Sequence, residues 1–208
     1  MTKKEFRTFA DESRSSLKRK DSRFIGVGVP VEAGEELELR RRELAEEFPK
    51  STHIASASVI INSGRRVERY DNDGEPSGTA GEPMLQVIKG EELVNAAVFA
   101  VRYFGGTELG TGGLVRAYSD TARGAIDAGK IVKRQPRDEF LVTYPYSFTG
   151  KVAETLAEFD QVKVLTRSYG EKPELKLSVP EGEEECLLNR LKELTSGSVE
   201  IGRVKEGD

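Results

Sequence analysis

The segment from residue 105 to residue 113 constrains the fold of this chain most strongly, because five of its nine residues are glycine. Glycine loses more backbone freedom on folding than any other residue, so this density indicates positive φ angles or close backbone approach. The alternating residues before it predict a strand over Asn95–Tyr103, and the pattern after it predicts a helix over Leu114–Ala128. A strand, a glycine loop and a helix start form a geometry that binds anions, because the first helical amides point outward. The alternative is a tight crossing of backbones with no ligand.

Polar and cationic side chains flank this glycine loop. Thr111 could cap the helix or donate to a phosphate, and Arg102 and Arg116 could pair with phosphate oxygens. A predicted hairpin over residues 53–70, with its turn at residues 62–64, would extend the patch with three more arginines. The candidate phosphate- and nucleic-acid-binding residues are Arg65, Arg66, Arg69, Arg102, Gly105, Gly106, Thr107, Gly110, Thr111, Gly112, Gly113 and Arg116.

The glycine loop does not match the specific nucleotide-binding motifs. A P-loop needs lysine directly after the second glycine of G-x-x-x-x-G, where this chain has Thr111. The dinucleotide pattern G-x-G-x-x-G needs glycine where Val115 stands. Neither an ATPase nor a dinucleotide-dependent enzyme is indicated, and we expect no cofactor.

An acidic, glycine-rich run precedes the predicted strand. Asp71, Asp73 and Glu75 alternate, so an extended backbone could place their carboxylates on one face, where magnesium would accept them. An EF-hand is excluded, because Pro76 occupies the position of its turn glycine. The favoured alternative is a turn-rich loop, in which hydroxyl groups bond their own backbone rather than a phosphate. This signature loop contains Asp71, Asp73, Gly74, Glu75, Pro76, Ser77, Gly78, Thr79 and Gly81.

Other catalytic arrangements have few residues to draw on. The chain has one cysteine, Cys186, and one histidine, His53, so it lacks the ligands of a zinc site. Cys186 lies on a predicted amphipathic helix and is expected in the core. No G-x-S-x-G elbow is present. We therefore assign no catalytic residue and no metal ligand.

The charge balance limits how this chain could attract nucleic acid. The 208 residues carry 32 Lys and Arg against 36 Asp and Glu, a net charge of −4. Residues 135–208 account for −5 of this and residues 1–134 for +1. Contact with nucleic acid would therefore depend on a local patch. The lone cysteine, the absence of a long apolar run and the polar residues 1–20 predict a cytoplasmic protein without a membrane segment.

The last third of the chain has a different pattern. Strands are predicted over Glu139–Tyr146, Gln161–Thr166, Glu174–Val179 and Val199–Val204, with helices over Gly150–Phe159 and Glu181–Leu194. The order β-α-β-β-α-β is that of the ferredoxin-like split motif. We therefore predict an α+β protein of two domains, residues 1–134 and 135–208.

Three segments resemble the signature of the IMPACT family over roughly residues 20–130. They are Asp73–Gly81, Val101–Gly106 and Leu109–Tyr118, and Ser22–Ile25 resembles an earlier motif. The resemblance implies a two-layer α/β first domain, like that of a ribosomal small-subunit protein and of domain four of elongation factor G. It also implies a non-enzymatic, translation-related regulator whose partners are RNA or ribosome-associated factors. Two alternatives stay open: an enzyme with a magnesium-binding acidic loop acting on a small phosphorylated or nucleotide ligand, and a pure protein-interaction module.

Overall fold

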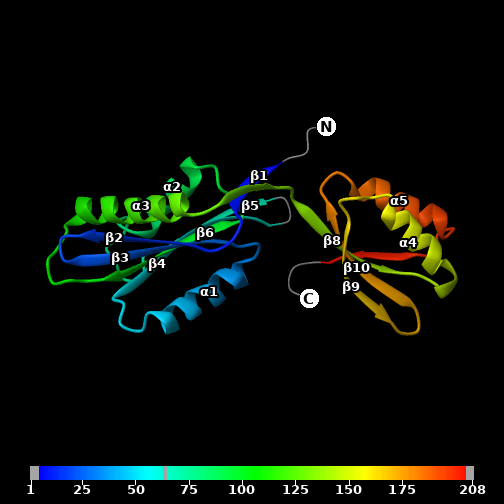
Figure 1. Ribbon diagram of the computed structural model, residues 1–208, viewed down its shortest axis with the longest axis horizontal. Helices are drawn as coiled ribbons and strands as arrows, with labels where there is room; N and C mark the ends of the chain where they lie inside the picture. Colours follow the sequence, from blue (N-terminus) through cyan, green and yellow to red (C-terminus); the bar gives the residue numbers. More distant parts are fainter. Residues whose placement is uncertain (1–4, 63–64, 205–208) are drawn as a thin grey trace. The chain divides into compact units, whose positions relative to one another are not determined.

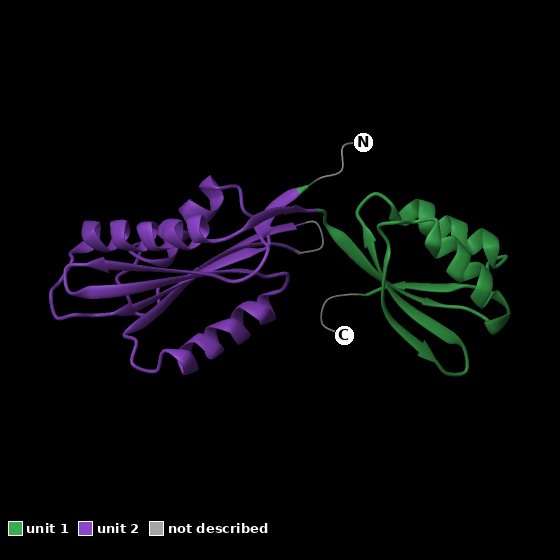
Figure 2. Ribbon diagram, viewed as in Figure 1, with its two compact units in different colours: residues 1–5, 135–208 green, residues 6–134 purple. Residues whose placement is uncertain are grey.

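The computed structural model describes residues 5–62 and 65–204, so most of the predicted hairpin turn at residues 62–64 lies outside the described residues. The chain divides into two compact units (Figure 2). One spans Phe6–Arg134, and the other contains the residues from Gln135 onward. The two units are described separately below.

The first unit is built on a five-stranded antiparallel sheet with the strand order β2-β3-β6-β4-β5. Strands β4, β5 and β6 agree with the predicted hairpin and strand to within two residues, whereas β2 was not predicted. A separate two-stranded pair joins β1 (Phe6–Phe9) to β7 (Ile131–Arg134). The strands of the main sheet are β2 (Ser13–Arg19), β3 (Ser22–Pro30), β4 (His53–Asn62), β5 (Arg65–Asp71) and β6 (Ala96–Tyr103).

Helices cover both faces of this sheet (Figure 1). Helices α2 (Gly81–Gly90) and α3 (Thr111–Ala128) pack on one face, and α1 (Gly34–Glu47) packs on the other. The first unit thus has three layers where the resemblance implied two. The reason is the apolar stripe of α1, whose Leu37 and Leu44 are buried against the second face.

Strand β6 lies at the centre of the sheet and is buried on both faces. Ala96, Val98 and Ala100 pack under α2 and α3, whereas Phe99 and Val101 pack toward α1. The alternation predicted for this strand is therefore confirmed.

Helix α3 begins earlier than predicted. It starts at Thr111 rather than Leu114, with Gly110 as the N-cap residue at a φ of 69°. The amide of Leu114 donates to the carbonyl of Gly110 over 2.9 Å, which closes the first turn. Thr111 is not the cap, and no side chain caps this helix. Gly112 and Gly113 consequently belong to the first helical turn and not to the loop.

The second unit has the predicted β-α-β-β-α-β order, with its four strands arranged antiparallel as β11-β8-β10-β9. Cys186 is exposed, which corrects its predicted place in the core. The helix buries Leu187 and Leu191 instead, and Cys186 lies off that stripe. The elements are β8 (Arg137–Thr143), a 3₁₀ turn η1 (Tyr146–Phe148), α4 (Thr149–Ala157), β9 (Lys163–Tyr169), β10 (Pro173–Pro180), α5 (Glu184–Leu194) and β11 (Glu200–Arg203).

None of the helices within the described residues combines the length and the apolar composition needed to cross a membrane.

Candidate functional site

The glycine loop lies exposed at the end of the sheet where β6 stops and α3 begins. Gly105, Gly106, Gly110, Thr111 and Gly112 are all solvent-exposed. The first amides of a helix have no partner within that helix. Within the part of the chain that the structure describes, the amides of residues 111–113 make no hydrogen bond. The start of α3 is therefore open to an acceptor from outside.

The glycines of this loop differ in what the backbone demands of them. A Cβ atom on Gly105 would overlap the backbone carbonyl of Asp21, and one on Gly113 would lie 3.1 Å from Leu109. Gly106 and Gly110 have positive φ angles of 94° and 69°. Gly112 needs neither explanation, since a Cβ there would approach only the guanidinium of Arg116, at 3.9 Å.

Arg116 is the predicted arginine that the structure places beside the start of α3. It is exposed, and its Nη1 lies near Gly112 because helical side chains point toward the N-terminus of their helix. It forms no ion pair or hydrogen bond with the described residues. Its positive charge is thus available to an anion at the exposed amides.

Arg102 is placed differently from the expectation that it would pair with phosphate. Its side chain is buried, with 5% of the residue exposed, and it forms an ion pair with Glu75. Its Nη2 also donates to the hydroxyl of Ser22 over 3.4 Å. The expected phosphate contact of Arg102 is therefore replaced by an internal one.

The hairpin arginines do not join the glycine loop. In the sheet register, His53 lies opposite Arg102 and Asn62 lies opposite Arg65. These ends of β4 are about 30 Å apart at the usual rise of a strand, so Arg65 and Arg66 lie at the end of the sheet away from the loop.

Three of the predicted site residues contact other residues of the first unit. Arg66 pairs with Glu68 at 2.9 Å, and Arg69 lies against Gly34 at the start of α1. Thr107 donates to the carboxylate of Asp21 over 2.5 Å. The predicted patch of five arginines is therefore wrong as one surface.

A buried polar cluster joins the three signature segments, each of which contributes one residue. Glu75 comes from the acidic loop, Arg102 from the end of β6 and Tyr118 from α3. The carboxylate of Glu75 accepts from Arg102 and, over 2.8 Å, from the hydroxyl of Tyr118. His53 borders this cluster, with its Nδ1 at 2.5 Å from the carbonyl of Asp73 and its Nε2 at 3.8 Å from Glu75. The cluster fastens the acidic loop to the sheet and to α3.

The acidic loop is folded on itself, so its three carboxylates do not share one extended face. Asp71 accepts from the amide of Asp73 over 2.9 Å, and Asp73 accepts from the amide of Ile54 over 2.6 Å. In the described residues, no group of three or more His, Cys, Asp or Glu side chains is placed to hold a metal ion. The alternative of a magnesium-binding loop therefore loses the donor arrangement on which it rested.

The other residues of the signature loop make its turns. The hydroxyl of Thr79 donates to the carbonyl of Pro76 over 2.6 Å, as the turn-rich alternative predicted. Gly74 and Gly78 have positive φ angles of 84° and 75°. A Cβ on Gly81 would come within 2.7 Å of the backbone of Asp71. Ser77 is exposed.

The functional reading of the sequence missed Tyr118 and Phe104. Tyr118 lies on the buried apolar stripe of α3, and a buried tyrosine usually bonds a polar partner. Phe104 follows the end of β6, and the guanidinium of Arg102 lies 5.3 Å from its ring centroid. The same guanidinium lies 5.5 Å from the ring of Phe24. The spacing of Arg102 and Phe104, two residues apart and so on one face of an extended backbone, was the sequence feature that could have indicated this contact.

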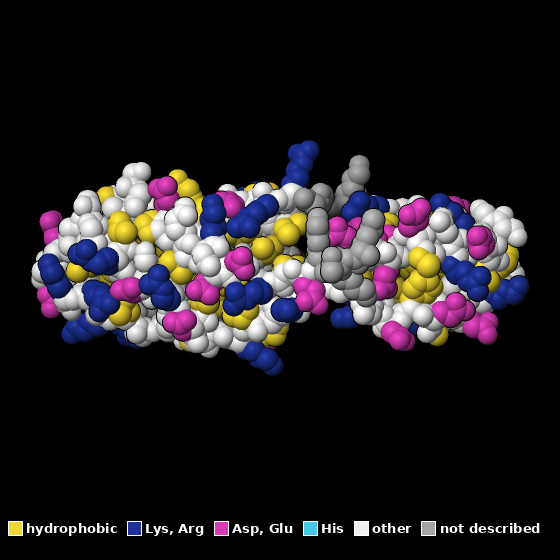
Figure 3. All heavy atoms as spheres, turned by 90° about the horizontal axis from the view of Figure 1, so that it is seen from above, with side chains coloured by type: hydrophobic (Ala, Val, Ile, Leu, Met, Phe, Trp, Pro, Cys, Tyr) yellow, Lys and Arg dark blue, Asp and Glu magenta, His cyan; other side chains and the backbone are white. Residues whose placement is uncertain are grey.

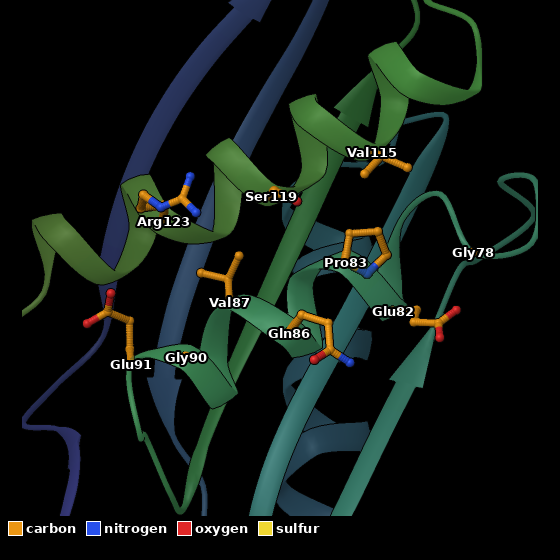
Figure 4. Close-up of a pocket in the computed structure, with 10 residues that line it drawn as sticks. All are labelled: Gly78, Glu82, Pro83, Gln86, Val87, Gly90, Glu91, Val115, Ser119 and Arg123. Atoms are coloured by element: carbon orange, nitrogen blue, oxygen red, sulfur yellow. The ribbon is translucent and has the colours of Figure 1, made fainter.

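An open groove of about 590 Å³ separates α2 from α3 (Figure 4). Its lining is mixed, with charged, amide and apolar side chains. Gly78 is the one predicted site residue that borders it. The lining residues are Gly78, Glu82, Pro83, Gln86, Val87, Gly90, Glu91, Val115, Ser119 and Arg123.

Burial gives Tyr118 a measurable effect on alkaline stability. Burial, followed by the negative charge of Glu75, raises the pKa of the Tyr118 hydroxyl well above its usual value near 10. As the pH rises, the unfolded chain therefore loses this proton before the folded chain does. The contribution of Tyr118 to the free energy of unfolding is complete below about pH 10. Above that pH it decreases by up to about 1.4 kcal/mol per pH unit. We expect Tyr118→Phe to flatten this alkaline decline, as measured by urea unfolding at a series of pH values.

The exposed Tyr70 offers a matched control, because Tyr70→Phe removes the same hydroxyl from the surface. An alkaline decline that is equally steep in the wild type and in Tyr118→Phe would contradict the buried hydrogen bond.

Comparison with known proteins supports the resemblance noted in the sequence. A family model described as the Impact N-terminal domain matches residues 20–126. The IMPACT family member YvyE of Bacillus subtilis is 33% identical, over 90% of this chain and 84% of its own length. YigZ of Escherichia coli, of the same family, is 27% identical over 90% of this chain and 92% of its own. A solved structure described as that of a hypothetical protein aligns with a TM-score of 0.72 at 25% identity, covering 99% of this chain and all of the other. This chain belongs to the IMPACT family.

Proposed function

We propose that this chain is a non-enzymatic, cytoplasmic, translation-related regulator that binds RNA through the start of α3. The observation that carries the proposal is the exposed start of α3, where, among the described residues, the amides of residues 111–113 have no hydrogen-bond partner and the nearby guanidinium of Arg116 has no ion pair. Helix N-termini attract phosphate through these amides and through the helix dipole. The translation-related part follows from the resemblance of the sequence to a family of translation regulators.

The glycine pattern supports a ligand at this place. Gly112 is not required by its φ angle or by a neighbouring atom of the fold, and glycine weakens a helix relative to alanine. A phosphate that approaches the amide of residue 112 closely would explain the missing Cβ. Glycine at position 112 is therefore not explained by the stability of the first unit.

The surroundings of the loop add positive charge. Lys20, in the turn between β2 and β3, donates to the carbonyl of Glu108 over 2.8 Å and so lies against the loop. Arg19 is next to it and pairs with Asp120 of α3 at 2.8 Å. Lys and Arg side chains gather, with acidic ones among them, at the end of the first unit where α3 begins (Figure 3). A local field of this kind can bind phosphate although the net charge of the chain is −4.

Removing the charge of Arg116 tests the proposal directly. We expect Arg116→Gln to weaken the binding of single-stranded RNA and to reduce the slope of log affinity against log salt by about 0.7, because one phosphate contact is lost. The measurement is fluorescence anisotropy of a labelled RNA with the full chain, repeated at several salt concentrations.

Arg66→Gln is the matched control, since it removes the same charge from the far end of the sheet. Screening in ordinary buffer acts over about 10 Å, so this variant should bind RNA like the wild type. Equal losses in both variants would indicate nonspecific attraction, and no loss in either would refute the start of α3 as the RNA site. A partner captured equally well after nuclease treatment would point instead to a protein-interaction module.

A further inference from the structure

Phe104 presents an aromatic ring to solvent at the end of β6, directly before the glycine loop. The residue is 45% exposed. Single exposed apolar residues are common on protein surfaces, so exposure alone carries no function. Phe104 differs from them in how its ring and its backbone are held.

The ring of Phe104 forms the outer layer of a stack that reaches the core. The guanidinium of Arg102 contacts the rings of both Phe24 and Phe104. Phe24 is fully buried and Arg102 nearly so, which leaves Phe104 as the layer in contact with solvent. A cation on a ring face holds the ring in one orientation. The ion pair with Glu75 in turn holds Arg102 in place.

The backbone on both sides of Phe104 is also fixed. Its amide donates to the hydroxyl of Thr52 over 3.0 Å, and the amide of Thr52 donates to the carbonyl of Arg102 over 2.7 Å. The next residue, Gly105, packs on the carbonyl of Asp21 with no room for a Cβ atom. An exposed ring that is already ordered loses little entropy when a ligand covers it.

The stack also contains an uncompensated polar atom. The Nε of Arg102 is buried and has no hydrogen-bond partner within the residues that the structure describes. Buried polar groups nearly always have a partner, so this atom is a cost that the ion pair with Glu75 does not remove. A role for the stack in binding accounts for this cost.

We propose that Phe104 is a stacking platform for a base of single-stranded RNA whose phosphate lies at the start of α3, an inference that rests on the proposed function. Every base has a π face, so an aromatic platform binds single strands with little sequence preference. In a duplex the base faces are already stacked and cannot reach a single ring. Tyr118, which bonds the same Glu75 as Arg102, is seven residues, about 10 Å, along α3 from Thr111. The ring of Phe104 and the amides at the start of α3 are therefore close enough to bind nucleotides that lie a few positions apart in one strand.

The test replaces the ring while keeping apolar bulk and charge. We expect Phe104→Leu in the full chain to lower the affinity for a short single-stranded RNA about tenfold or more, the usual contribution of one base stacked on an aromatic side chain. The salt slope should not change, because no charge is removed. Phe104→Tyr retains the π face and should bind like the wild type, and anisotropy titrations compare all three proteins.

An RNA with abasic sites supplies the matched ligand, since it keeps the phosphates and lacks the bases. For the abasic strand, the affinity of Phe104→Leu should equal that of the wild type. The two proteins should also have equal affinities for a duplex of the same length. Thermal unfolding of Phe104→Leu confirms that the variant is folded. Equal affinities of wild type and Phe104→Leu for the normal strand would overturn the stacking role. That result is distinguishable from failure of the proposed function, which would be an unchanged salt slope in Arg116→Gln.

Discussion

Replacing Glu75 with alanine is expected to lower the free energy of unfolding of the unit Phe6–Arg134 by about 3–5 kcal/mol, the usual cost of leaving one partner of a buried ion pair alone. Glu75 and Arg102 are both nearly inaccessible to solvent, and the ring of Phe24 packs against the guanidinium. Without Glu75, the side chain of Arg102 retains a single hydrogen bond within the described residues, the 3.4 Å bond to Ser22, and Tyr118 loses its acceptor. Denaturant unfolding of the full chain measures the loss, and hydrogen exchange of the β6 amides assigns it to this unit.

Two further variants separate the ion pair from general damage. The double variant Glu75→Leu with Arg102→Met replaces the pair by apolar groups and should be more stable than Glu75→Ala, because no charge is left buried. Glu68→Ala removes an exposed carboxylate that pairs with Lys89 and Arg66, and should leave stability close to that of the wild type. If Glu75→Ala and Glu68→Ala had equal effects, the pair would not be buried in solution.

The same cluster shows how far the sequence could predict the site. Alternation along β6 predicts correctly that Arg102 shares a face with Val98 and Ala100. It says nothing about what lies above that face at the strand end. The partner, Glu75, is 27 residues earlier in the chain, and only the tertiary fold brings the two together. Arg102, which the sequence suggested as a phosphate ligand, thus forms an internal ion pair with Glu75.

The position of Arg65 and Arg66, away from the glycine loop, could not be predicted for a related reason. The sequence predicts a hairpin that carries Arg65 and Arg66, but not which end of the sheet its turn occupies. That position follows from the pairing of β4 with β6, in which Ala96 lies opposite Val59 and Arg102 opposite His53. Long-range register of this kind is not contained in local periodicity.

Strand β2 and the start of α3 escaped prediction because small residues replace the usual apolar signal. In β2, Ser13 donates to the carbonyl of Ala125, and Ser15 packs at Gly124, so the strand approaches α3 through hydroxyl groups, with Leu17 as the large apolar side chain that joins this core. At the start of α3, Gly112 and Gly113 have low helix propensity and resemble loop residues. Tertiary packing overrides both local preferences.

Replacing Gly105 with alanine is expected to destabilise the first unit by about 3 kcal/mol, toward the upper end of the usual cost of overpacking. The added Cβ would overlap the carbonyl of Asp21, a backbone atom that no rotamer change can move away. Relief would require the β2–β3 turn to shift, together with the bond between Thr107 and Asp21.

Gly112→Ala is the matched control for Gly105→Ala, because it adds the same methyl group in the first turn of α3, where a Cβ has room. It should raise stability, by up to about 1 kcal/mol, since alanine is the better helix former. Calorimetry of the two full-length variants measures the difference. The two variants are expected to separate folding from binding: Gly105→Ala should lower stability, whereas Gly112→Ala should lower RNA affinity in a fully stable protein. Equal stability of the two variants would show that the backbone of Gly105 does not pack against the carbonyl of Asp21. Of the two backbone contacts that hold Phe104 in place, only the hydrogen bond to Thr52 would then remain.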